Sequence, residues 1–308
     1  MTTSTTQLGN YPANANTKQK GILDFTRQVN GNYVMTQLKN VLGKNAGTFA
    51  TSLIEVFTND SQLQRCDTKK VLQEAVKAAT LKLPLNKQLG YSYILVFNQY
   101  NKETRQSEPT PQLVIGYKGY IQLAMRTGQY RNINADVVYE GEFTGFDKLT
   151  GGIRLDGTPT SKRVIGYFAH FELINGFTKM LFMTLQDMAA YALAYSPSFK
   201  RNPEKNPIPS VDKLCDIANE QAANGAVQGK VGWEGNFNSM AKKTVLRRLL
   251  STYGYLSIEM MDALDIDERQ TAQQIRDEIN EEEKKTFDAS AIVEEIEDTK
   301  NDPGDCPV

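Results

Sequence analysis

The clearest candidate for chemistry is a group of cations on one predicted helix. Residues 236–258 contain no acidic side chain, and a helix there places Lys243 and Arg247 on one face with Arg248 near its border. Apolar side chains fill much of the opposite arc, so this helix can pack on a sheet while it presents cations outward. Cations without neighbouring acids suit a phosphate backbone, and the pattern therefore predicts a nucleic-acid contact. A solvated basic helix without a ligand is the alternative.

Other residues extend this candidate surface. Lys242 falls within the apolar arc of the same helix, so its side chain either reaches past the core edge or lines a groove. A second predicted helix carries polar side chains every four residues, which is also the pattern of an ordinary solvated face. Weaker signals come from basic pairs at a strand entrance and in the proline-rich segment 196–210. The predicted nucleic-acid-binding residues are Lys118, Gln122, Arg126, Lys162, Arg163, Lys200, Arg201, Lys242, Lys243, Arg247 and Arg248.

The charge of the chain is divided between its body and its end. Residues 259–308 contain 17 acidic and 5 basic side chains, which leaves 30 basic and 19 acidic ones in residues 1–258. The formal net charge of −1 therefore conceals a basic body joined to an acidic tail. A basic body attracts polyanions, and an acidic tail is typical of a solvated interaction segment. Nucleic acid is the first partner to expect.

Several chemistries are disfavoured by what the sequence lacks. His170 is the only histidine and lies in an alternating run that predicts a strand, which argues against two-histidine catalysis and Cys/His zinc sites. Neither a G-x-x-x-x-G-K-[ST] phosphate loop nor a G-x-G-x-x-G turn occurs. We therefore expect a protein that is not an enzyme and has no catalytic residue, cofactor or bound metal.

The expected location is the cytoplasm. The three cysteines, Cys66, Cys215 and Cys306, are far apart and odd in number, which suits a reducing compartment. Residues 1–20 lack the apolar stretch of a signal peptide, and no apolar run approaches the ~20 residues that span a bilayer.

Two alternatives of other classes remain open. A metal-dependent nuclease needs clustered carboxylates near a cationic groove, and Asp136, Glu140, Glu142 and Asp147 occur close together in the sequence. A structural or adaptor protein would use the acidic tail for a partner, with an incidental basic surface.

The elements that must position these residues predict an α+β fold. Strands bracketed by helices, without β-α-β alternation, favour antiparallel hairpins over a parallel sheet. Asn175-Gly176 predicts a hairpin turn, and Thr184 with Asp187 resembles a helix-capping box. Predicted helices cover residues 33–42, 47–58, 68–83, 117–127, 185–195, 211–224 and 233–253, and predicted strands cover 90–97, 111–115, 133–139, 164–174 and 178–183.

Three separated blocks carry a specific resemblance. They are LNKQLGYSYILVF at 85–97, QLVIGYKGYIQLA at 112–124 and WEGNFNSMAKKTVLRRL at 233–249. Together they resemble the RecT family of phage and prophage recombinases, over about residues 60–258. The resemblance implies ATP-independent binding and annealing of single-stranded DNA in homologous recombination, by subunits assembled in rings or helical filaments. It also implies a bent antiparallel sheet packed with a long helix, related to the annealing-protein core.

The chain is expected to have three parts. Residues 1–30 read as a flexible polar arm, residues 31–258 as the DNA-binding, annealing and oligomerisation domain, and residues 259–308 as an acidic, mobile, partner-binding tail. The expected partners are single-stranded and annealed duplex DNA, further copies of the chain, and, through the tail, a phage exonuclease and a host single-strand-binding protein. No membrane contact is expected.

Overall fold

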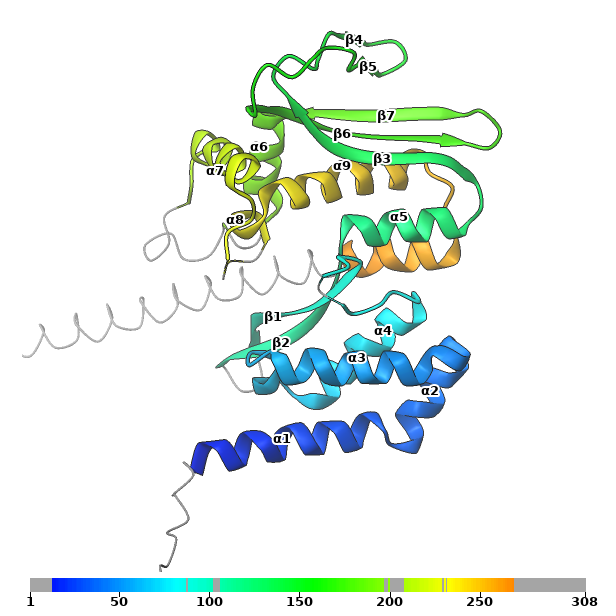
Figure 1. Cartoon of the computed structure of the whole chain (residues 1–308), viewed down its shortest axis with the longest axis vertical. Helices are drawn as coiled ribbons and strands as arrows, with labels where there is room; N and C mark the ends of the chain where they lie inside the picture. The colour runs from blue at the N-terminus through cyan, green and yellow to red at the C-terminus, as the bar shows by residue number, and fades with distance from the viewer. Residues whose placement is uncertain are drawn as a thin grey trace, which may run out of the picture.

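Four helices open the chain and form the lower part of the molecule in Figure 1. The computed structural model describes residues 13–86, 88–101, 106–196, 199, 208–228, 230 and 232–268. Asp67 begins the fourth helix as its side chain predicts, by accepting a hydrogen bond from the Lys69 amide. The helices are α1 (Ala13–Val29), α2 (Asn32–Leu42), α3 (Ala46–Asn59) and α4 (Thr68–Thr80), with single 3-10 turns η1 (Gly43–Asn45) and η2 (Leu63–Arg65).

A long hairpin follows these helices. Strand β1 (Ser92–Asn101) pairs antiparallel with β2 (Gln106–Ile115). The Glu74 carboxylate of α4 accepts a hydrogen bond at 2.8 Å from the amide of Leu113, which joins the helices to the hairpin. The predicted strands cover only residues 90–97 and 111–115, whereas the observed pairing extends to Asn101 and Gln106. The backbone hydrogen bonds of the hairpin also accommodate the polar side chains of these additional residues.

The second half of the chain is built on a three-stranded antiparallel sheet with the order β3-β6-β7. The helix α9 (Phe237–Tyr253) crosses one face of this sheet, and α5 (Tyr117–Arg126) lies beneath α9 in Figure 1. The strands are β3 (Tyr130–Tyr139), β6 (Val164–Leu173) and β7 (Thr178–Thr184), with a small hairpin of β4 (Gly145–Asp147) and β5 (Gly152–Arg154). The helices α6 (Leu185–Tyr195), α7 (Val211–Asn224) and α8 (Gly232–Gly235) gather at one end of the sheet.

Local signals in the sequence explain the turns of this half. Gly176 adopts a φ of 86° between β6 and β7, a conformation that favours glycine. The Thr184 side chain accepts a hydrogen bond from the Asp187 amide and so begins α6. The predicted turn at residues 175–176 and the predicted helix start are both confirmed.

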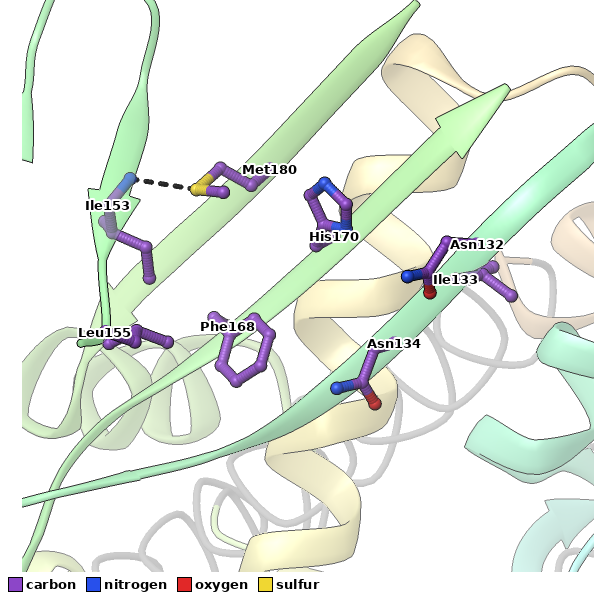
Figure 2. Close-up of a pocket in the computed structure, with 8 residues that line it drawn as sticks. All are labelled: Asn132, Ile133, Asn134, Ile153, Leu155, Phe168, His170 and Met180. Carbon is purple, nitrogen blue, oxygen red and sulfur yellow. Dashed lines mark hydrogen bonds between the residues drawn. The ribbon is translucent and has the colours of Figure 1, made fainter. Parts of the chain in front are cut away.

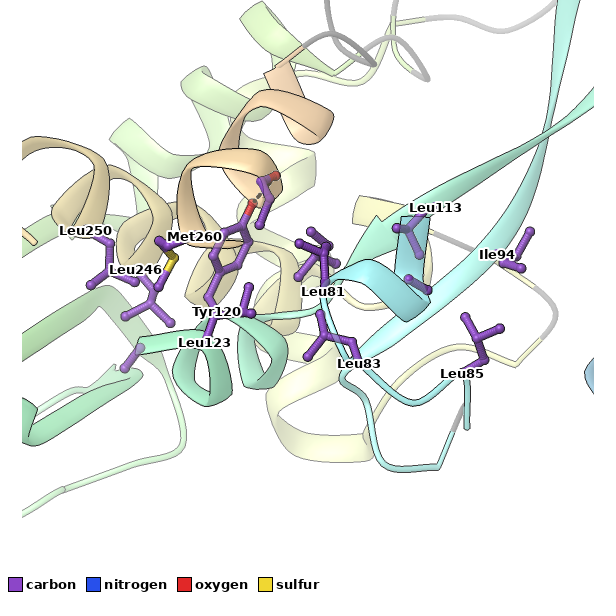
Figure 3. Close-up of a cluster of buried hydrophobic side chains, with 14 of the residues drawn as sticks. Leu81, Leu83, Leu85, Ile94, Leu113, Tyr120, Leu123, Leu246, Leu250 and Met260 are labelled. Carbon is purple, nitrogen blue, oxygen red and sulfur yellow. Dashed lines mark hydrogen bonds between the residues drawn. The ribbon is translucent and has the colours of Figure 1, made fainter. Parts of the chain in front are cut away.

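One core connects the two halves of the molecule. Figure 3 shows Leu81, Leu83, Ile94 and Leu113 of the first half in the same buried cluster as Tyr120, Leu123, Leu246, Leu250 and Met260 of the second. The α+β prediction is confirmed, with antiparallel sheets, N-terminal helices and a long helix against a sheet. Among the described helices, none combines the length and apolar composition that crossing a bilayer requires.

The structure differs from the expected organisation at both chain ends. Part of the predicted arm forms α1, where Phe25 and Val29 are fully buried and Phe25 stacks on Phe57 of α3. The predicted tail begins with a helix over residues 258–268, in which Met260 and Ala263 are fully buried. Residues 13–29 are polar overall and residues 258–268 are strongly acidic, but in both segments apolar side chains recur every three or four residues and supply a packing face. The remaining tail, residues 269–308, lies outside the described residues.

Candidate nucleic-acid interface

The central helix α9 is enclosed by other elements, and its cations project in different directions. The Asn236 side chain begins the helix by accepting a hydrogen bond from the Ser239 amide. Its buried side chains pack on the sheet and on neighbouring helices; they are Phe237, Ala241, Thr244, Val245, Leu246, Leu249 and Leu250. The four basic residues of α9 therefore do not form one continuous stripe.

Lys243 and Arg247 face the helix over residues 258–268. The Lys243 ammonium lies 2.9 Å from the Asp267 carboxylate, whose other nearby cation is Arg247, with its Nε 4.0 Å away. The Tyr120 hydroxyl donates a hydrogen bond of 2.6 Å to the same carboxylate. Burial, and then the adjacent carboxylate, raise the pKa of Tyr120 well above its ordinary value. We call Tyr120, Lys243, Arg247 and Asp267 the Asp267 cluster.

Lys242 leaves α9 on another side. Its ammonium lies 3.4 Å from the Asp136 carboxylate of β3 and 4.9 Å from the centre of the Tyr117 ring. The side chain is 19% exposed, so its stem passes the core edge before the charge reaches this position. Of the two alternatives expected for Lys242, this geometry agrees with the one in which the side chain reaches past the core edge.

Lys118 is exposed beside Tyr117, where α5 meets the hairpin. Glycines permit this close approach, since a Cβ on Gly116 would lie 2.2 Å from the Gly90 carbonyl oxygen. Burial, and then the neighbouring Tyr117, raise the pKa of Tyr93. We call Tyr93, Tyr117, Lys118 and Lys242 the hairpin junction, which brings predicted cations from α5 and α9 to one region.

The remaining residues of the α5 stripe have other environments. Arg126 donates hydrogen bonds of 2.8 Å to the carbonyl oxygens of Leu81 and Lys82, at the end of α4. Gln122 is half-buried. The stripe thus connects an exposed cation at the junction with a guanidinium that caps another helix.

Three other predicted residues, Arg248, Lys162 and Arg163, have environments outside the junction. Arg248 is exposed on the side of α6, with its guanidinium 5.6 Å from the centre of the Tyr191 ring. Lys162 and Arg163 are exposed just before β6, where Arg163 lies 3.9 Å from Glu140. Lys200 and Arg201 lie outside the described residues.

The carboxylates considered for a nuclease take part in separate contacts. Asp136 pairs with Lys242, Glu142 accepts a hydrogen bond from the Tyr139 amide, and Glu140 accepts one from Ser161. A hydrogen bond from Thr150 is the main cause that lowers the pKa of Asp147. In the part of the chain that the structure describes, no three His, Cys, Asp or Glu residues form a group that could hold a metal ion.

A hollow of about 410 Å³ lies on the sheet face away from α9. Figure 2 shows Asn132, Asn134, Phe168, His170 and Met180 around it, without a basic residue from the predicted set. The Nε2 atom of His170 lies 2.9 Å from the Thr178 hydroxyl, in agreement with a sheet position for this histidine. The hollow and the predicted phosphate contacts are therefore separate features.

The sequence was compared with families of known proteins. It matches the sequence model of the RecT family over residues 47–286, a region that contains the hairpin junction and the Asp267 cluster. The chain belongs to the RecT family. Membership supports a role in recombination and strand annealing.

Two relatives show how far the RecT-family likeness extends. The chain is 35% identical to the uncharacterized protein YqaK of Bacillus subtilis over 243 residues, which are 79% of this chain and 71% of YqaK. It is 30% identical to Protein RecT of Escherichia coli over 213 residues. That match covers 68% of this chain and 66% of the Escherichia coli protein, so it spans slightly less than two thirds of the relative.

The sequence did not predict the two acidic partners of the α9 cations, which are Asp136 for Lys242 and Asp267 for Lys243. Asp136 was considered only as a nuclease carboxylate, and Asp267 only as part of a solvated tail. Tyr120, whose hydroxyl donates a hydrogen bond to Asp267, is fully buried. A usable signal was present, because Met260, Ala263 and Leu264 recur at helical spacing around the acids of residues 258–268.

Proposed function

We propose that this protein binds single-stranded DNA through its sugar-phosphate backbone and anneals complementary strands without a nucleotide. The family match over residues 47–286 carries the proposal, since it includes both helices that supply cations to the hairpin junction. Lys118 and Lys242 offer positive charge there without an arrangement that selects one base. Contacts of this kind leave the base edges free for a second strand.

The proposed mechanism is physical rather than covalent. Two bare strands repel each other, and cations that neutralise phosphates lower this repulsion at the cost of salt sensitivity. Sequence recognition is left to base pairing between the strands. No step requires a catalytic residue, a cofactor or a metal, and the sequence contains no phosphate loop that would bind ATP.

We further propose that several copies of the chain act together on DNA. One subunit offers few phosphate contacts, so a long duplex intermediate needs neighbouring subunits along it. The N-terminal helices are the candidate contact surface, with Leu23 51% exposed and Tyr33 77% exposed. A helical filament or ring would provide such a continuous array.

Residues 269–308 are proposed to recruit proteins rather than DNA. They contain 12 acidic and 5 basic side chains, a balance that disfavours contact with phosphates. An exonuclease of the same pathway and a single-strand-binding protein are the proposed partners. A function on host-cell DNA places the protein in the bacterial cytoplasm.

Incubation of end-labelled complementary strands with the full chain and Mg²⁺, without nucleotide, tests the proposal. The expected product is full-length duplex, formed faster than by the strands alone. Shortened strands would instead support the metal-dependent nuclease. Unchanged single strands would support an adaptor without annealing activity.

A further inference from the structure

The helix over residues 258–268 is strongly anionic, and it packs against the most basic segment of the fold. It contains five acidic residues and no basic one; the acids are Glu259, Asp262, Asp265, Asp267 and Glu268. Residues 236–258, which include α9, contain four basic residues and no acid. Figure 1 shows this helix, in orange, beside α5 and between the two halves of the molecule.

One carboxylate of this helix, that of Asp267, lies against Lys243 and Arg247, the two cations of α9 that the sequence predicts to contact DNA phosphates. Asp267 is 7% exposed, and its oxygens lie 2.9 and 3.1 Å from the Lys243 ammonium. The side chains of Lys243 and Arg247 are only 13% and 26% exposed. In this conformation Asp267 therefore limits the access of any other anion to both cations.

The carboxylate does not satisfy both cations completely. The Arg247 Nε is buried and has no hydrogen-bond acceptor among the described residues. Among the described residues, two cations thus lie against one carboxylate, and the Arg247 Nε remains an unpaired donor. A phosphodiester carries the same charge and similar oxygen acceptors, so it matches the chemistry that Asp267 supplies.

The attachment of this helix is confined to one side. Met260, Ala263 and Asp267 face the core, whereas Ile258 is 72% exposed and Met261 is 49% exposed. Residues 254–257 connect it to α9 outside any helix or strand. Displacement of the helix would therefore break the contacts of one face and leave the hydrogen bonds of α9 itself intact.

We propose that the helix over residues 258–268 is an internal mimic of a nucleic-acid strand, which covers Lys243 and Arg247 until a DNA phosphate replaces Asp267. The proposal rests on the proposed DNA-binding function and adds its regulation. In the free protein the helix covers these two cations, and only a strand that also contacts the exposed hairpin junction displaces it. Binding is thereby biased toward strands long enough to make both contacts.

Hydrogen–deuterium exchange of the full chain, with and without saturating thymidine homopolymer, tests this displacement. The proposal expects faster amide exchange across residues 258–268 when the oligonucleotide is bound. Unchanged or slower exchange in that helix, with the oligonucleotide demonstrably bound, would overturn the proposal and leave the proposed function intact. A chain that fails to bind the oligonucleotide would refute both.

A matched pair of variants separates displacement from a general charge effect. Asp267→Asn should raise the affinity for the homopolymer about tenfold, because the competing charged acceptor is lost. Asp262→Asn removes the same charge from an exposed position on the same helix and should change the affinity much less. Equal effects of the two variants, or weaker binding by Asp267→Asn, would contradict the proposal. If Asp267→Asn unfolds, exchange in the native chain remains the deciding measurement.

Discussion

Asp136 and Lys242 lie 106 residues apart in the sequence, yet their charged groups are 3.4 Å apart beside the Tyr117 ring. The pair joins the edge strand β3 to the central helix α9 at the hairpin junction. Because Asp136 is 59% exposed, this ion pair is screened by water and contributes little to stability. Lys242 is therefore free to exchange a carboxylate partner for a phosphate.

Loss of the Lys242 charge should weaken binding to all DNA sequences alike. Lys242→Met keeps the apolar stem and should reduce the slope of log K against log salt by about 0.7, the value of one contact on a single strand. Fluorescence anisotropy at several salt concentrations measures this slope. Lys213→Met, at an exposed position on α7 outside the predicted set, is the control and should leave the slope unchanged.

The two cations of α5 should have opposite phenotypes. Lys118→Met should weaken DNA binding and leave the unfolding midpoint unchanged, because Lys118 is exposed at the hairpin junction. Arg126→Met should lower the free energy of unfolding by about 1 kcal/mol, because two carbonyl oxygens at the end of α4 lose their donor. Urea unfolding and anisotropy of both variants give the comparison. The assignment of Arg126 to helix capping fails if its variant is fully stable but defective in DNA binding.

Lys243 and Asp267 should be strongly coupled in stability. Lys243→Met leaves the buried Asp267 carboxylate without its nearest cation and should cost about 3–5 kcal/mol of unfolding free energy. Combining it with Asp267→Asn should restore part of that loss. A double-mutant cycle in urea measures the coupling, and additive effects of the two substitutions would show that the pair is not energetically linked.

Truncation after Glu268 should preserve annealing in vitro and impair recombination in cells. The shortened chain keeps Met260, Ala263 and Asp267, and with them the contacts of the last described helix. It loses only the acidic segment proposed to recruit partner proteins. Annealing and recombination frequency are the two measurements. Loss of DNA binding by a truncated chain that still unfolds cooperatively would assign the segment to the binding core.

Local patterns in the sequence predicted most of the secondary structure. The predicted helix over residues 211–224 has the same bounds as α7, and the caps at Asp67 and Thr184 form as their side chains require. Alternation and a turn signal likewise predicted β6 and β7, because these features depend on neighbours in the chain. The two ends of the described fold were harder to predict. Helix α1 is polar overall and residues 258–268 are strongly acidic, and both segments gain stability mainly through tertiary packing.

The environment of each candidate cation could not be predicted in the same way. Helical periodicity correctly groups Lys243 with Arg247, but it does not reveal that a carboxylate 24 residues beyond Lys243 lies against them. The α5 stripe is equally regular, yet Arg126 reaches α4 because the tertiary fold brings the Leu81 carbonyl within 2.8 Å. Spacing defines a face of a helix, whereas the partner of that face depends on contacts distant in the sequence.

The rate of annealing in the absence of nucleotide tests the central claim most directly. Two complementary strands that carry a donor and an acceptor fluorophore are mixed with the full chain after enzymatic removal of any ATP. The account predicts duplex formation well above the rate of the bare strands, unchanged by added ATP and similar for unrelated sequences of equal length. Acceleration that appears only with ATP, or no acceleration in a chain that is folded, would contradict it.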